Sequence, residues 1–405
     1  MNILLINHYA GSLKYGMEFR PYYFARKWVE KGHNVTVLAA SFSHLRHKQP
    51  EKEREEIDGI AYQYFSTPTY SGNGMKRILT MLSFPLKLRL NAKRIAAERK
   101  FDVVIASSTY PLDIYPAKKI ADLCSAKLIF EVHDLWPLSP MLLGGYSEKH
   151  PFIKVMQRAE DYAYAHCDCV VSLLPNADKH MLKRGLKQEK FYYIPNGIVK
   201  QDWLNMPEAP VEYRQVFDSL REEGKFIVCY FGGHNLSNAL EHLIEAAAQI
   251  EDEDIIFVMV GDGDKKAELI KESTHSGKNN IVFLPPVSKK YIPKILDMTD
   301  VVYFGAAKNP LYEYGVAMNK IFDSMMAAKP VICGVEASND IIGDAKAGLT
   351  IAAEDATAIN EAIAALKAMT PQQRAEMGEN GRRTVLEQYE YETLSEQFLN
   401  VMVNC

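Results

Sequence analysis

The segment from residue 314 to 332 holds the densest group of side chains that could bind a charged ligand. It begins as a glycine loop and continues as a helix, in which Lys320 and Asp323 are three positions apart and share a face. A carboxylate there can accept hydrogen bonds from a ribose diol, and an ammonium can reach a diphosphate. The alternative is a surface ion pair at a helix start. The preceding glycine loop favours a binding site that comprises Asn319, Lys320 and Asp323.

Two glycine motifs follow predicted strands. Gly232-Gly233 comes after an apolar run at 226–231, and Gly261-Asp-Gly263 comes after a run at 255–260. Ligands of parallel sheets bind beyond the carboxyl ends of the strands, where glycines let backbone amides approach a phosphate. The alternative is a pair of tight turns that any such fold needs. Position 266 is Lys266, where a dinucleotide fingerprint has its third glycine, so we expect no nicotinamide or flavin cofactor.

Other polar groups follow strands in the first half of the chain. His133-Asp134 comes directly after an apolar run at 128–132, and a glycine-containing loop at 8–18 follows the first run. A buried His-Asp pair that closes a strand, and an ordinary long turn, are the structural alternatives.

Asp252-Glu-Asp254 resembles a metal-binding D-x-D pattern, but it precedes a strand within a charge run, so we interpret it as a solvated turn. No metal site is expected.

The elements that must position these groups alternate between short β-branched runs and amphipathic stretches, which is typical of βαβ units on parallel sheets. The chain is therefore predicted to be α/β, with six strands in each half. A polar stretch between 198 and 224 without a sustained strand marks the boundary, which we place near residue 205. The predicted domains span 1–204 and 205–384, and a terminal helix at 385–405 is expected to pack back on the first domain. The predicted strands are 3–9, 35–39, 103–107, 128–132, 170–173 and 192–194, then 226–231, 255–260, 281–284, 301–304, 331–333 and 349–352.

The composition of the chain excludes several classes of protein. The 405 residues include 47% hydrophobic and 24% charged residues and carry a formal net charge of −4, so no basic field for nucleic acid is present. Six scattered cysteines without a C-x-x-C pair indicate a reducing cytoplasm. No uncharged apolar run reaches the roughly 18 residues that a membrane span needs, and no signal segment is evident.

One segment is strongly basic, although the whole chain has a negative net charge. Residues 75–100 contain eight Lys or Arg and one acid, and Met75, Ile78, Leu79, Leu82 and Leu86 fall at helical spacing on one face. A basic amphipathic helix is typical of attachment to an anionic membrane surface. The alternative is a crossover helix that packs on its own sheet and exposes a basic face.

The motifs together resemble those of family 4 retaining glycosyltransferases, in the branch that includes bacterial surface-polysaccharide fucosamine and N-acetylhexosamine transferases. The resemblance covers most of the chain and is carried by a glycine loop after the first strand, Glu131-Val-His-Asp-Leu-Trp-Pro137, Ile194-Pro-Asn-Gly197, Val260-Gly-Asp-Gly263, Leu284-Pro-Pro-Val287 and the 314–332 segment, in the family's order. It implies the GT-B fold, in which two Rossmann-like domains face a cleft.

The resemblance also implies roles. Asp323 falls where the family places the second glutamate of its E-x7-E motif, the ribose ligand, whereas Gly315 replaces the first glutamate. The amides of Tyr314, Gly315 and Val316 would then replace the usual contact to the donor sugar. The family's Arg and Lys after Gly232-Gly233 are absent, so Lys320 must neutralise most of the diphosphate. The remaining implied residues are Val287 for the donor, His133 and Asp134 at the reacting centre, and Gly11, Gly16 and Glu18 for the acceptor.

The predicted function is that of a hexosyl-transferring, metal-independent, retaining glycosyltransferase without a cofactor. It would move a sugar from a nucleotide sugar, expected to be UDP-linked, to a lipid-linked saccharide in the synthesis of bacterial O-antigen or capsule. We expect a cytoplasmic protein that attaches peripherally to the inner face of the membrane. Two alternatives stay open: a UDP-sugar epimerase of the same fold, which needs no acceptor, and a non-catalytic nucleotide-sugar sensor or scaffold.

Overall fold

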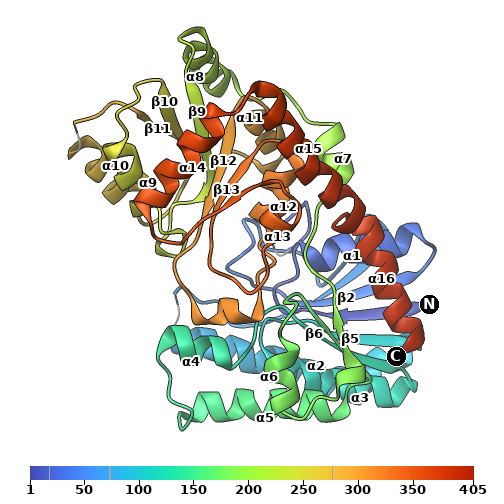
Figure 1. Cartoon of the computed structure of the whole chain (residues 1–405). Coiled ribbons are helices and arrows are strands. Elements are labelled where there is room, and N and C mark those ends of the chain that lie inside the picture. The colour runs from blue at the N-terminus through green and yellow to red at the C-terminus, as the bar shows by residue number, and fades with distance from the viewer. Residues whose placement is uncertain (18, 73, 276) are drawn as a thin grey trace. The chain divides into compact units, whose positions relative to one another are not determined.

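The computed structural model describes residues 1–17, 19–72, 74–275 and 277–405. These residues divide into two compact units, each built around one sheet. Unit 1 comprises residues 1–196, 314–316 and 391–405, and unit 2 comprises 197–313 and 317–390. The chain thus changes unit after Asn196, whereas the sequence predicted a boundary near residue 205. Figure 1 shows the order of the elements along the chain.

Unit 1 contains an eight-stranded sheet in the order β3-β4-β2-β1-β5-β6-β7-β8. Neighbouring strands are parallel except β3 and β4, which form a hairpin. The strands are β1 (Asn2–Ile6), β2 (Asn34–Ala40), β3 (Arg54–Ile57), β4 (Ile60–Phe65), β5 (Val103–Ala106), β6 (Lys127–Val132), β7 (Cys169–Ser172) and β8 (Phe191–Tyr193). The hairpin was not predicted. The other strands of this sheet match the predicted runs to within a few residues.

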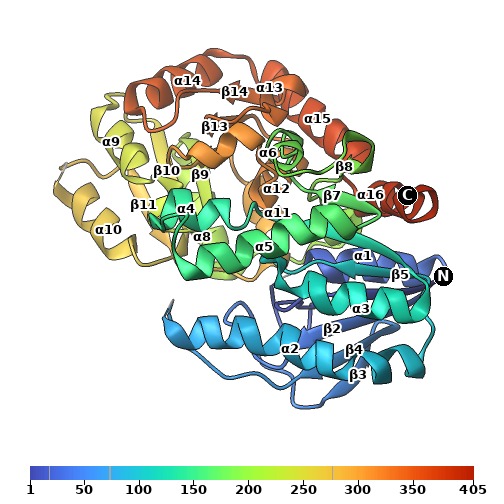
Figure 2. The same cartoon turned by 90° about the horizontal axis from the view of Figure 1, so that it is seen from below.

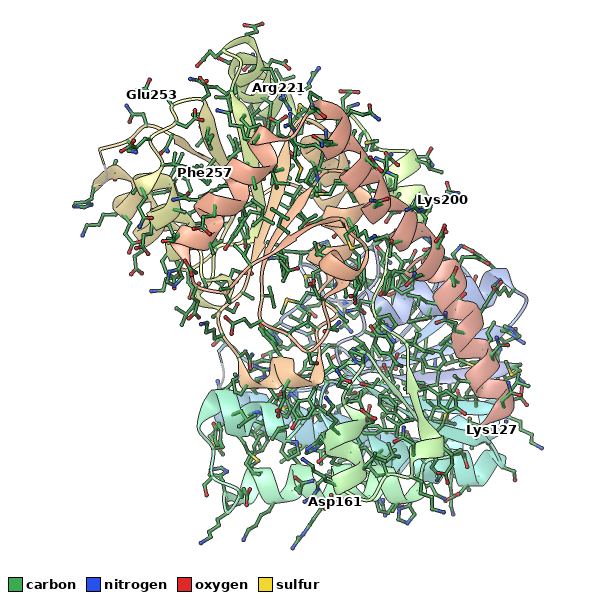
Figure 3. All side chains as sticks on the ribbon, viewed as in Figure 1. Lys127, Asp161, Lys200, Arg221, Glu253 and Phe257 are labelled. Atoms are coloured by element: carbon green, nitrogen blue, oxygen red, sulfur yellow. The ribbon has the colours of Figure 1, made fainter. Side chains whose placement is uncertain are left out.

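Helices cover both faces of this sheet. The helices are α1 (Arg20–Glu30), α2 (Met75–Glu98), α3 (Ile114–Cys124), α4 (Leu138–Gly144), α5 (Pro151–His166), α6 (Asp178–Lys183) and α16 (Tyr391–Asn404). In Figures 1 and 2, α2, α3 and α5 lie on one face, and α1 and α16 lie side by side on the other. Trp28 and Phe24 of α1 contact the ring of Phe398, so the terminal helix packs on unit 1. Lys127, labelled in Figure 3, donates to the Val403 carbonyl near the end of α16.

Unit 2 contains a six-stranded parallel sheet in the order β11-β10-β9-β12-β13-β14. The strands are β9 (Phe226–Gly233), β10 (Ile255–Asp262), β11 (Ile281–Leu284), β12 (Val301–Gly305), β13 (Val331–Gly334) and β14 (Gly348–Thr350). The chain order within this sheet is the 3-2-1-4-5-6 order of dinucleotide-binding folds, which bind ligands where the order reverses. That point lies at the carboxyl ends of β9 and β12.

The core of unit 2 packs helices α9 and α14 against the sheet, with Phe257 of β10, labelled in Figure 3, among its buried residues. The helices are α7 (Lys200–Leu204), α8 (Val211–Glu222), α9 (Glu241–Gln249), α10 (Lys266–His275), α11 (Ile292–Asp297), α12 (Asn319–Met326), α13 (Ile341–Asp344), α14 (Ala356–Ala368) and α15 (Pro371–Gln388). Helices α12 and α15 pack together. The predicted terminal helical segment is therefore two helices, α15 in unit 2 and α16 in unit 1.

Candidate active site

Lys320 lies in the first turn of α12, and its ammonium group contacts the glycine loop that follows β9. The Nζ atom donates to Oδ1 of Asn238 at 2.8 Å and to the Tyr230 hydroxyl at 3.0 Å. A Cβ atom on Gly232, whose φ is +125°, would lie 2.9 Å from Nζ, so a side chain there would displace the ammonium. Burial lowers the pKa of Lys320 to about 8. Because both partners are neutral oxygens, they leave the positive charge uncancelled.

The two partners of Lys320 also shape the glycine loop. The Tyr230 hydroxyl donates to the Gly233 carbonyl at 2.6 Å, and the Asn238 amide donates to the same oxygen at 2.9 Å. The neighbouring strand approaches just as closely, because a Cβ atom on Gly261 would lie 1.9 Å from the Gly232 carbonyl. Gly263 is similar, with a Cβ position 2.3 Å from the His234 carbonyl. Glycine at these positions thus allows two backbones and one ammonium to meet at the carboxyl ends of β9 and β10.

Asp323 follows Lys320 along α12. Burial raises the pKa of its carboxyl group; Lys289 opposes that shift and Asp202 adds to it. A buried carboxylate gains stability from any hydrogen bond that it accepts, as a ribose diol would provide. Asn319 is the first residue of α12, and Val287 is half-buried in the loop after β11. Unit 2 therefore contains eight of the predicted donor-binding residues: Gly232, Gly233, Gly261, Gly263, Val287, Asn319, Lys320 and Asp323.

The remaining donor-binding candidates belong to unit 1. Tyr314, Gly315 and Val316 group with that unit, and the Tyr314 carbonyl accepts a hydrogen bond from the Asn176 amide at 3.0 Å. That these backbone amides bind the donor together with Lys320 stays a prediction.

Unit 1 places a buried charged network at the carboxyl end of β6. Glu131 accepts from Nε of Arg20 at 2.9 Å with one oxygen, and from the Ser107 hydroxyl at 2.6 Å with the other. His133 Nε2 lies 3.0 Å from the Ser107 hydroxyl and 3.3 Å from Glu131. Burial alone would raise the pKa of Glu131, but Arg20, His133 and Ser107 outweigh it and lower that pKa to about 2. The ionised carboxylate thereby orients the imidazole of His133.

Arg20 connects this network to the segment that follows β8. Its two terminal nitrogens donate to the carbonyls of Pro195 at 2.5 Å and Ile194 at 2.8 Å, just before the chain leaves the unit after Asn196. The ring of Phe24 lies 4.6 Å from the guanidinium carbon. Arg20 is only 3% exposed, so one buried guanidinium holds strand β6, helix α1 and the segment after β8 together.

Asp134 does not pair with His133. Its Oδ1 accepts from the Leu135 amide at 2.9 Å and from the Ser139 hydroxyl at 2.7 Å, which stabilises the turn into α4. The sequence considered the two residues as one pair, whereas the structure assigns His133 to the Glu131 network and Asp134 to a turn. A catalytic role for either stays a prediction.

The predicted acceptor loop is tightly folded. A Cβ atom on Gly11 would lie 1.9 Å from the Gly16 carbonyl, and one on Gly16, whose φ is +99°, would lie 2.5 Å from the His47 ring. The Gly11 carbonyl accepts from the Tyr62 hydroxyl at 3.1 Å. Both glycines thus allow close packing within unit 1, and Glu18 lies outside the described residues.

Helix α2 has two apolar faces. Its buried face packs Met81, Phe84, Leu88, Ala92 and Ile95 into unit 1. A second stripe, here called the leucine stripe, is 43–75% exposed and consists of Met75, Leu79, Leu82, Leu86 and Leu90. The helix packs on its sheet as the alternative interpretation expected, but its exposed side is not simply basic. None of the helices in the described part of the chain has the length and hydropathy to span a membrane.

The acidic D-x-D pattern lies at the amino end of β10. Asp252 contacts Lys367 at 2.6 Å, and Asp254 lies 3.7 Å from Lys225; Glu253 between them is labelled in Figure 3. Among the described residues, no group of three or more His, Cys, Asp or Glu side chains could hold a metal ion.

Arg20, Ser107 and Glu131 were missed as site residues. Glu131 does carry a signal, because it is an acid inside the apolar run Leu-Ile-Phe-Glu-Val, and a buried carboxylate needs a partner. Nothing local identifies Arg20 as that partner, since 111 positions separate the two residues.

Solved structures of GT-B glycosyltransferases have the same fold as this chain. The chain superposes on Anabaena Alr3699/HepE, a structure solved in complex with UDP, with a TM-score of 0.71 at 16% identity, covering 100% of both chains. It superposes on WaaG, a glycosyltransferase involved in lipopolysaccharide biosynthesis, with a TM-score of 0.66 at 15% identity, again over 100% of both. The fold is therefore GT-B, as the sequence predicted.

Family models agree with the fold. Residues 15–201 match the model described as Glycosyltransferase Family 4, and residues 212–384 match the model described as Glycosyl transferases group 1. The chain belongs to the family 4 glycosyltransferases.

Two curated relatives come from Escherichia coli. "Putative colanic acid biosynthesis glycosyl transferase WcaI" of strain K12 is 28% identical over 189 residues, 45% of either chain. "O-antigen chain mannosyltransferase C" is 24% identical over 255 residues, which are 62% of this chain and 64% of the relative. The matched region thus spans less than two thirds of either relative.

Proposed function

We propose that this protein transfers a sugar from a nucleotide-sugar donor, UDP-linked, to a lipid-linked saccharide acceptor, with retention of anomeric configuration. The observation that carries the proposal is the Lys320 ammonium, buried beside the glycine loop of β9 and bonded to two neutral oxygens. A positive charge that its neighbours do not cancel suits the diphosphate of a nucleotide sugar. HepE has been solved in complex with UDP and in complex with UDP-glucose, which supports this class of donor.

The chemistry of transfer follows from that charge. As the bond between the sugar and the diphosphate breaks, negative charge grows on the departing phosphate and positive charge grows on the sugar ring. Lys320 stabilises the first, together with backbone amides of the glycine loops, and Asp323 holds the ribose. A phosphate oxygen of the leaving group takes the proton of the acceptor hydroxyl, so the reaction needs neither a strong general base nor a metal ion.

In unit 1 we assign the reacting centre to His133. The ionised Glu131 and the Ser107 hydroxyl orient its imidazole, so it is preorganised toward a sugar hydroxyl. Asp134 maintains the turn that follows, and the loop with Gly11 and Gly16 borders the acceptor.

The acceptor class is supported by the names of the relatives, which refer to colanic acid biosynthesis and to an O-antigen chain. We propose that the product is a bacterial surface polysaccharide that is assembled on a lipid carrier. The leucine stripe of α2, with basic residues beside it, supports peripheral attachment to an anionic membrane on which such carriers reside.

A transfer assay tests the proposal. The protein is incubated with a panel of UDP-sugars and lipid-linked saccharides, and glycosylated lipid and free UDP are measured together. Transfer with retained configuration is expected. Release of a new sugar isomer from the donor alone would indicate the epimerase instead, and UDP-sugar binding without any turnover would indicate a sensor or scaffold.

Vesicle sedimentation tests the attachment. The protein is expected to bind vesicles that contain phosphatidylglycerol, and a Leu79→Gln, Leu86→Gln variant should bind at least tenfold less. A Leu123→Gln variant, which changes an exposed leucine of α3, serves as the control. Equal binding by the stripe variant would exclude the leucine stripe as the membrane contact.

A further inference from the structure

A second lysine of unit 2, Lys266, has its ammonium group at the carboxyl ends of β10 and β11. It is the first residue of α10 and is half-buried. Its Nζ atom donates to the Gly261 carbonyl at 2.7 Å and to the Leu284 carbonyl at 3.0 Å. An ammonium group has three protons to donate, so these two bonds leave one proton for a further acceptor. Both partners are neutral, so neither of them compensates the positive charge.

The acidic residues beside Lys266 in the sequence have other partners. Glu268 pairs with Lys265 at 2.6 Å, and Asp262 accepts from the Gly263 amide at 2.9 Å. No ion pair within the described part of the chain includes Lys266. The adjacent lysines therefore differ, because a carboxylate compensates the charge of Lys265 and none pairs with Lys266.

The ends of β9 and β10 connect Lys266 to the site of Lys320. Gly232 and Gly261 are partners in the parallel register of these strands, and a Cβ atom on Gly261 would lie 1.9 Å from the Gly232 carbonyl. A Cβ atom on Gly232 would lie 2.9 Å from the Lys320 ammonium, and the Gly261 carbonyl accepts from Lys266. Two paired glycines thus each lie against one ammonium group.

The ring of His234 lies between the surroundings of the two lysines. Its centroid is 5.8 Å from the ring of Tyr230, which bonds Lys320, and 6.2 Å from the ring of Phe283 on β11. His234 is 0% exposed, and neither ring nitrogen has a hydrogen-bond partner among the described residues. Burial lowers the pKa of His234 to about 4; the charges of both lysines add to that shift and Asp262 opposes it.

This combination of groups favours an anionic ligand. Buried polar side chains ordinarily have hydrogen-bond partners, and the His234 ring has none although it lies between two cations. Each cation is bonded to two neutral oxygens and has a third proton to donate. An anion with acceptor oxygens at more than one position would satisfy both ammonium groups.

We propose that Lys266 binds the diphosphate of the nucleotide sugar as a second cation beside Lys320. This inference rests on the proposed function and deepens it, because the sequence predicted that Lys320 neutralises most of the diphosphate. A diphosphate carries negative charge on two phosphate groups, and a charge-assisted hydrogen bond to each needs a separate donor. Dinucleotide-binding loops have a glycine at the position of Lys266, where it allows close packing of helix and strand. Lysine at this position brings a charge to the same strand end.

Titration calorimetry with UDP and with inorganic pyrophosphate tests the proposal on the wild type and on two variants. Lys266→Gln should weaken the binding of both ligands about tenfold or more, the loss of one hydrogen bond to a charged group. Lys265→Gln is the matched control: it removes the same charge from the adjacent residue, whose ammonium is bonded to Glu268. This control should bind both ligands as the wild type does. Circular dichroism verifies that each variant is folded.

A conservative variant separates charge from packing. Lys266→Arg retains the positive charge and should bind UDP more tightly than Lys266→Gln does. Equal losses in the two variants would contradict the role of the charge.

The remaining outcomes are also decisive. Unchanged UDP affinity in Lys266→Gln would exclude the residue from the donor site. A loss for UDP without a loss for pyrophosphate would overturn the diphosphate contact and assign Lys266 to the loop after β11, whose Leu284 carbonyl it bonds. Equal losses in Lys266→Gln and Lys265→Gln would indicate an effect of net charge only.

Failure of the proposed function is recognised separately, because calorimetry needs no turnover. Binding of UDP that depends on Lys266, in a protein that transfers no sugar, would contradict the proposed function and leave this inference intact. Binding of pyrophosphate but not of UDP would contradict the UDP-linked donor alone. A wild type that binds neither ligand would overturn both.

Discussion

The buried charges at the carboxyl ends of the two sheets differ in whether an opposite charge compensates them. In unit 2, Lys320 is bonded to Tyr230 and Asn238, which are neutral, so its charge is left for a ligand. In unit 1, the charges of Arg20 and Glu131 cancel each other, and the pair serves to orient His133. In unit 2, an uncompensated buried ammonium can attract an anionic ligand, and the cost is the desolvation of its charge. In unit 1, a compensated ion pair fixes the orientation of a neighbouring side chain but leaves no net charge to attract a ligand.

The largest effect is expected from a substitution that breaks the ion pair of Arg20 with Glu131. Arg20→Met leaves the Glu131 carboxylate buried without its cation and should lower the free energy of unfolding of unit 1 by about 3–5 kcal/mol. Urea titration followed by circular dichroism measures the change. The exposed pair of Arg184 with Asp161 supplies the control, since Arg184→Met should cost at most about 1 kcal/mol. Asp161 is labelled in Figure 3. Similar losses for both variants would contradict the distinction.

The next largest effect is expected from a substitution that removes the positive charge of Lys320. Lys320→Gln should weaken UDP binding by about 1.5–3 kcal/mol, the range for a hydrogen bond to a charged group, without lowering the stability of unit 2. Calorimetry with UDP measures the affinity. Lys329→Gln is the matched control, because burial also lowers the pKa of Lys329, which precedes the amino end of β13. Unchanged affinity in a folded Lys320 variant would exclude that lysine from the donor site.

The pH dependence sharpens the comparison. Burial lowers the pKa of Lys320 to about 8, and under the proposed function only the protonated form attracts the diphosphate. UDP affinity should therefore fall about tenfold for each pH unit above that pKa, and it should be flat in Lys320→Gln. The lowered pKa has the opposite effect on folding: the unfolded chain binds more protons between pH 8 and 10.5, so stability rises over that window. A wild-type affinity that does not change between pH 7 and 10 would contradict this assignment.

The smallest expected effect is none. Under the proposed function, transfer activity should survive EDTA, because Lys320 and the backbone amides would supply the positive charge that a metal ion otherwise provides. Activity measured with and without EDTA decides this. Loss that Mg²⁺ or Mn²⁺ restores would return attention to Asp252 and Asp254.

Periodicity in the sequence was sufficient to predict both sheets, because buried parallel strands are apolar runs of characteristic length. It missed the hairpin of β3 and β4, although Asp58-Gly59 lies between them with positive φ at both residues, a turn that favours hairpins. The first strand, Arg-Glu-Glu-Ile, is too polar for a test based on apolar runs to detect.

The positions of the candidate site residues were predictable where the motif is local. Lys320 and the glycines Gly232 and Gly261 lie beside strand ends, and the fold brings strand ends together. The network of Arg20 and Glu131 depends on a contact between distant segments, which spacing along the chain does not reveal. For α2, periodicity indicated that an apolar face exists, but with two apolar stripes on one helix only packing decides which becomes buried.

The uncancelled charge of Lys320 has a consequence for turnover under the proposed function. Free UDP carries more negative charge than a UDP-sugar, so an ammonium that assists departure of the leaving group binds the departed product more tightly than the donor. Faster bond breaking is then accompanied by slower product release. The steady-state rate would be set by the escape of UDP from the glycine loop, and accumulated UDP would inhibit the enzyme.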